Sequence, residues 1–171
     1  MKFEHQPTNA SGTGYLSRQP EYLVLEGYRH WIAGFETDSV VPWEQAWGIY
    51  SGILGPNHGR KAMSDLTFFV RTLRNCAHCP LRTFPFGARR VCREECLVLG
   101  LISGIQHKTD CTSKICLDAL TCPKSKANLA EAAAAFAATL ASFKQFMVPV
   151  TPCSILDILE RSANGSPVTF H

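Results

Sequence analysis

The spacing of the apolar residues constrains the fold more than any other feature of this sequence. The clearest segment is PWEQAWGIYSGILG, residues 42–55, in which apolar side chains recur at intervals of three and four residues. Pro42 suits the first turn of a helix, and the Gly55-Pro56 step ends it. We therefore predict an amphipathic helix over this segment.

The same helical spacing recurs along most of the chain, and no segment shows the alternation typical of a strand. It predicts further helices over 22–36, 58–74, 91–105, 112–121 and 125–146, and a last one that starts at Thr151-Pro152. In 129–147 the apolar residues keep a near-heptad spacing. Because this repeat covers fewer than three heptads, we expect it to pack inside the domain rather than to form an intermolecular coil.

These helices predict the fold class and the domain organisation. A chain of 171 residues fits one domain. We expect an all-α fold, a compact bundle of six or seven helices, built from residues 20–163. Residues 1–19, rich in Gly, Ser, Thr, Asn and Pro, are predicted to be a disordered leader, and residues 164–171 a tail.

One cysteine-rich stretch interrupts the helical pattern. Residues 75–96 read NCAHCPLRTFPFGARRVCREEC, with two prolines and a glycine between positions 80 and 87. Prolines and glycine at this density predict an irregular loop over about 75–91. Four of the eight cysteines of the chain lie in or beside that loop: Cys76, Cys79, Cys92 and Cys96.

The spacing of these four cysteines is typical of a zinc site. Two intervening residues let the thiolates of Cys76 and Cys79 point at one ion, and an i, i+4 pair puts Cys92 and Cys96 on one helical face. Four thiolates would leave no open coordination position, so we expect structural zinc in a protein with a binding or regulatory role. We also predict that Cys92, near a helix N-terminus among arginines, ionises easily.

A second, looser set of ligand residues follows in the sequence. It consists of His107, Cys111, Cys116 and Cys122. A site with three cysteines and one histidine is a weaker prediction, because these gaps match no standard spacing of zinc ligands. Cys153 stands alone after a proline and is not expected to bind metal.

Three other interpretations of the cysteines stay open. An iron–sulfur cluster also uses four thiolates, and the Cys79-Pro80 step is common beside such clusters. Cys76-Ala77-His78-Cys79 could be a redox dithiol, although no strand pattern surrounds it as in thioredoxin-like proteins. Finally, the cysteines could be small buried side chains in a helical module that binds a protein partner or forms a homo-oligomer.

Basic residues coincide with the first cysteine set. Residues 60–93 contain eight arginines and lysines and a single acidic residue, Asp65. Those flanking the proposed zinc site are Arg82, Arg89, Arg90 and Arg93. We weigh an anionic partner such as nucleic acid against a simply solvated surface, or against charge compensation around a zinc tetrathiolate.

The remaining features bear on location and on enzyme classes. No run approaches eighteen consecutive apolar residues, and the first twenty residues lack the apolar segment of a secretory signal. We therefore expect a cytoplasmic protein without a membrane span, in a reducing compartment where structural disulfides are rare. The sequence has neither a phosphate-binding glycine loop nor a nucleophile elbow, and it names no reaction.

Overall fold

The structure, a computed structural model, describes residues 14–165 and is helical almost throughout. Its seven α-helices are α1 (Gln19–Thr37), α2 (Val41–Leu54), α3 (Pro56–Cys76), α4 (Arg93–Gln106), α5 (Asp110–Leu120), α6 (Lys126–Ser142) and α7 (Pro152–Ala163). Two short 3-10 helices, η1 (Tyr15–Ser17) and η2 (Pro123–Ser125), complete the element order. The predicted all-α bundle of six or seven helices is confirmed.

Most of the predicted leader, 1–19, and most of the predicted tail, 164–171, lie outside the described residues. Of the leader, residues 15–17 form η1, whose Tyr15 and Leu16 pack against the hydrophobic core. In the described part of the chain, no helix combines the length and the hydrophobicity that crossing a membrane requires.

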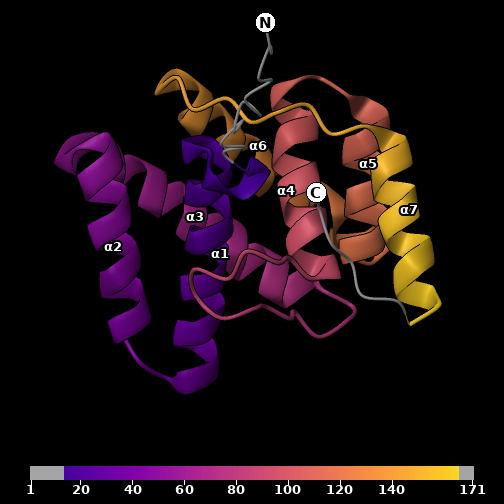
Figure 1. The fold of residues 1–171 in the computed structure, drawn as a ribbon, viewed down its shortest axis with the longest axis horizontal. Coiled ribbons are helices and arrows are strands. Elements are labelled where there is room, and N and C mark those ends of the chain that lie inside the picture. The colour runs from indigo at the N-terminus through magenta and orange to yellow at the C-terminus, as the bar shows by residue number, and fades with distance from the viewer. Residues whose placement is uncertain (1–13, 166–171) are drawn as a thin grey trace, which may run out of the picture.

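Helix α4 is the centre of the bundle. Every residue from Glu94 to Gly104 is buried. Figure 1 shows α4 with α1 on one side, α5 and α7 on the other, and α2 at the far edge of the molecule. Helices α5 and α7 approach α4 closely at Gly100. A Cβ at this position would lie 2.7 Å from Cδ1 of Ile155 in α7 and 2.9 Å from Sγ of Cys116 in α5.

The near-heptad repeat over 129–147 packs inside the domain, where α6 lies against α3 and α4. Only its first part is helical, because α6 ends at Ser142. Lys144 adopts a left-handed conformation with φ of 61°, and the N–H of Gln145 donates to the carbonyl of Leu140 at 2.9 Å. Met147 is still buried, but it lies in the extended segment that leads to α7.

The segment 77–92 joins α3 to α4 without a helix and passes below α4 in Figure 1. Buried charged side chains hold its backbone. Arg29 of α1 donates to the carbonyls of Ala88 and Arg90, at 3.0 and 2.7 Å. Glu95 of α4 accepts the N–H of Phe84 at 2.9 Å. The path of this segment is therefore set by side chains of the helix bundle itself.

Candidate functional site

The eight cysteines differ in their exposure to solvent, and none of them forms a disulfide. Two, Cys96 and Cys116, are buried. The half-buried cysteines are Cys76, Cys92 and Cys122, and the exposed ones are Cys79, Cys111 and Cys153. The half-buried and the exposed cysteines can react with external molecules, whereas the buried ones are shielded from them.

Cys76 and Cys122 are brought together although they come from different predicted sets. Cys76 is the last residue of α3, and Cys122 precedes η2. Between these two segments Ala77 pairs with Thr121 in an isolated antiparallel bridge, and the hydroxyl of Thr121 donates to the carbonyl of Cys76 at 2.8 Å. Cys76 directly precedes Ala77 and Cys122 directly follows Thr121, so both cysteines adjoin this bridge, Cys76 as the last helical residue of α3. A disulfide between them would need Cα atoms about 4.4–6.8 Å apart.

The Cys122 thiol lies in a polar environment. Its Sγ is 3.7 Å from the hydroxyl oxygen of Ser125. Hydrogen bonds from the side chain and the backbone of Ser125 stabilise the thiolate and lower the pKa of Cys122. Cys122 is thus the described cysteine whose surroundings favour ionisation.

Cys92 and Cys96 begin α4 as predicted, but both are poor sources of thiolate. Cys92 caps the helix, and its Sγ donates to the carbonyl of Arg82 at 3.2 Å. Burial, together with the charges of Glu95 and Glu94, raises the pKa of Cys92 to about 12. The prediction that Cys92 ionises easily is therefore wrong, because burial and two carboxylates outweigh the helix dipole.

The buried thiols Cys96 and Cys116 pack where α4 meets α5. Burial, then the charge of Cys92, raises the pKa of Cys96, and burial alone raises the pKa of Cys116 to about 12. Cys116 lies against Gly100 of the central helix. These two cysteines fit the interpretation as small buried apolar side chains.

The weaker set does not converge on one point. Nε2 of His107 lies 2.6 Å from the carbonyl oxygen of Met147, in the segment that follows α6. Cys111 is in the first turn of α5, whereas Cys122 follows its last turn. A helix of this length separates such positions by about 16 Å at 1.5 Å per residue.

Cys79 completes the first set and lies in the exposed part of the loop. Nδ1 of its neighbour His78 is 3.0 Å from its Sγ. Across residues 14–165, no three His, Cys, Asp or Glu side chains form a group that could hold a metal ion. The metal sites predicted from spacing stay predictions.

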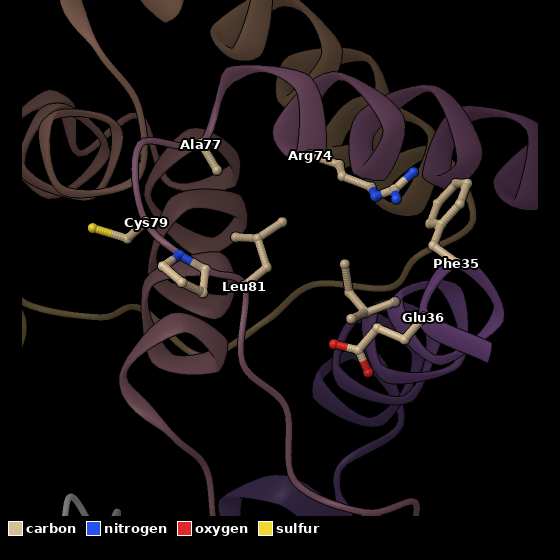
Figure 2. Close-up of a pocket in the computed structure, with 8 residues that line it drawn as sticks. Phe35, Glu36, Arg74, Ala77, Cys79 and Leu81 are labelled. Atoms are coloured by element: carbon tan, nitrogen blue, oxygen red, sulfur yellow. The ribbon is translucent and has the colours of Figure 1, made fainter. Parts of the chain in front are cut away.

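Two hollows adjoin the end of α3. The first, of about 230 Å³, is lined by Arg74, by residues of α1 such as Phe35 and Glu36, and by Leu81 of the loop. Figure 2 shows the sulfur of Cys79 pointing away from this space. The second, of about 280 Å³, lies between α3 and α6, and the residues that line it are Phe68, Thr72, Asn75, Cys76, Asn128 and Glu131.

The basic residues of the loop are disposed in two ways. Arg82, Arg89 and Arg90 are exposed. Arg93 is half-buried and pairs with Glu94 at 3.2 Å. The three exposed guanidinium groups are accessible to an anionic partner, and binding of nucleic acid through them stays a prediction.

The site is thus a pair of thiols at the junction of α3 with η2, next to a polar groove.

Comparison of the chain with protein-family models, with curated proteins and with solved structures finds no match.

Proposed function

We propose that this chain is a cytoplasmic redox regulator whose reactive unit is the dithiol Cys76–Cys122. The observation that carries the proposal is the Ala77–Thr121 bridge, which has Cys76 and Cys122 as its immediate chain neighbours. In the reduced form both thiols are free. In the oxidised form a disulfide joins the end of α3 to the turn before η2, and so fixes the residue from which the 77–92 loop departs.

The different pKa shifts of the cysteines support this proposal. Cys92, Cys96 and Cys116 have raised pKa values and stay protonated at neutral pH, so they are weak nucleophiles. The lowered pKa of Cys122 gives it a larger thiolate fraction. An oxidant is therefore directed to the surface pair rather than to the core.

Hydrogen peroxide oxidises the pair in two steps. The Cys122 thiolate attacks one oxygen of the peroxide, the O–O bond breaks, and the hydroxide that leaves takes a proton to become water. Sγ of Cys76 then loses its proton and attacks the sulfenic acid on Cys122. The S–S bond forms, a second water leaves, and two electrons have passed from the two thiols to the peroxide.

The test is to map the disulfide. Reduced protein is treated with hydrogen peroxide, its remaining thiols are blocked with N-ethylmaleimide, and the digest is examined by mass spectrometry. We expect loss of two thiols and a linked peptide that contains Cys76 and Cys122. Cys122→Ser should abolish this linkage, whereas the control Cys153→Ser, at an exposed cysteine on α7, should leave it unchanged. A stable disulfide between other cysteines, or none at all, would refute the proposal.

Zinc is the second candidate, and the same bridge favours it in a revised form. Cys122 adds a third thiol beside the Cys76-x2-Cys79 pair. Zinc binding by these three would require the exposed loop around Cys79 to move. Elemental analysis of anaerobically purified protein measures the metal, and a brown colour would indicate an iron–sulfur cluster instead. Loss of zinc in Cys122→Ser but not in Cys96→Ser would support the revised set over Cys76, Cys79, Cys92 and Cys96.

A further inference from the structure

Cys76, one cysteine of the proposed pair, is among the residues that line the groove between α3 and α6. Its α3 side consists of Phe68, Thr72, Asn75 and Cys76, which share one helical face. The same two helices pack on each other through the rings of Phe69 and Phe136, whose centroids lie 6.0 Å apart. Cys76 is thus one of the residues that line a groove between two packed helices.

We propose that this groove binds one half of a small peptide disulfide and presents its S–S bond to Cys76. The inference rests on the proposed function, because it names the class of oxidant that the Cys76–Cys122 pair accepts. The volume of about 280 Å³ lies near the lower end of small-molecule sites, which suits one half of such a molecule. The other half stays outside, where it can leave.

The polar side chains of the groove match the groups of a peptide. Asn75 and Asn128 each offer an amide with donors and an acceptor, as a peptide bond does. The carboxylate of Glu131 can pair with an ammonium group of the ligand. Within the described residues no hydrogen bond or ion pair engages these three side chains, so all are available to a ligand.

Phe68 supplies the apolar contact at the edge of the groove. Its side chain is 53% exposed, although phenylalanine is usually buried. The ring can cover the methylene groups of a peptide ligand, which an inorganic anion lacks. Apolar and amide-matching groups together favour a peptide over an inorganic anion.

The thiol–disulfide exchange proceeds in two steps. The Cys76 thiolate attacks the nearer sulfur of the bound disulfide, the S–S bond breaks, and the outer half leaves as a thiolate that takes a proton. Cys122, as a thiolate, then attacks Sγ of Cys76 and releases the half that lies in the groove. Two electrons pass from the protein dithiol to the ligand, which yields two small thiols and the Cys76–Cys122 disulfide.

The experiment compares the rates at which three oxidants form this disulfide. They are oxidised glutathione, which has amides and ammonium groups, bis(2-hydroxyethyl) disulfide, which has neither, and hydrogen peroxide. We expect oxidised glutathione to react at least about tenfold faster than the hydroxyethyl disulfide, as two or more hydrogen bonds allow. Asn128→Ala should remove most of this preference and leave the rate with peroxide unchanged. Alanine is the best helix former, so this exposed position on α6 should tolerate it.

Asn57→Ala is the matched control, since Asn57 is an exposed asparagine of α3 outside the groove, and it should preserve the preference. Equal rates with the two disulfides, or an unchanged preference in Asn128→Ala, would overturn the groove assignment. In that case, formation of the Cys76–Cys122 bond by peroxide would leave the redox function standing. Failure of every oxidant to form this bond would overturn both.

Discussion

Arg29 of α1 and Glu95 of α4 form an ion pair that is wholly excluded from solvent, with Nε of Arg29 2.7 Å from Oε1 of Glu95. Glu26, one turn before Arg29, pairs with the same guanidinium at 2.9 Å. Although burial alone lowers the pKa of Arg29, the hydrogen bonds and charges of Glu95 and Glu26 raise it overall. This network also binds the backbone of the 77–92 loop, and it therefore links the bundle to the segment that carries Cys79.

Arg29→Met is predicted to be strongly destabilising. It leaves two carboxylates buried without their partner, which typically lowers the free energy of unfolding by about 3–5 kcal/mol. It also removes the donors to Ala88 and Arg90, so the loop should become more susceptible to proteolysis. Urea unfolding and limited trypsin digestion measure the two effects. The exposed Arg60→Met is the control and should stay within about 0.5 kcal/mol of wild type.

The sequence predicts the helices well because apolar periodicity reports burial, and burial dominates helix placement in such a bundle. Met147 is buried without being helical. It continues the apolar repeat of α6 and is 2% exposed, yet it lies five residues beyond the end of that helix. Periodicity reports that a residue is buried, not by which backbone conformation it reaches the core.

The candidate site was less predictable, because spacing rules treat only residues that are near in sequence. Spacing pairs Cys76 with Cys79, whereas the Ala77–Thr121 bridge joins the end of α3 to the segment that carries Cys122, just beyond the far end of α5. Glu95 lies in the first turn of α4, but its main partner, Arg29, comes from another helix. The available signal was Arg29 itself, an arginine within the apolar segment 22–36 that would need a buried counter-ion.

Thiol reactivity should follow the pKa shifts. A lowered pKa moves the rise in thiolate fraction to lower pH, so Cys122 should react with iodoacetamide at lower pH than free cysteine does. Ser125→Ala removes the hydroxyl that stabilises the thiolate and should shift this profile to higher pH. Alkylation rates from pH 6 to 9, followed by peptide mass spectrometry, test both statements. Identical profiles for Cys122 in the two proteins would contradict the role of Ser125.

Gly100→Ala should destabilise the contact of α4 with α5 and α7. The added methyl group would lie 2.7 Å from Ile155 and 2.9 Å from Cys116, and such overpacking typically costs about 1–3 kcal/mol. Cys116→Ala in the same chain should restore part of the loss, since it removes the thiol that is crowded. Gly48→Ala is the control, because nothing lies within 4 Å of its added Cβ. That exposed helical position should gain roughly 0.5–1 kcal/mol.

Oxidation of the Cys76–Cys122 pair should stabilise the native protein. The disulfide would close a loop of about 46 residues, for which the loss of chain entropy in the unfolded state gives up to about 4 kcal/mol. We expect the urea midpoint of peroxide-treated protein to exceed that of reduced protein, and dithiothreitol to reverse the increase. Cys122→Ser should have the same midpoint before and after treatment. A lower midpoint in the oxidised wild type would mean that the bond strains the Ala77–Thr121 bridge rather than fitting it.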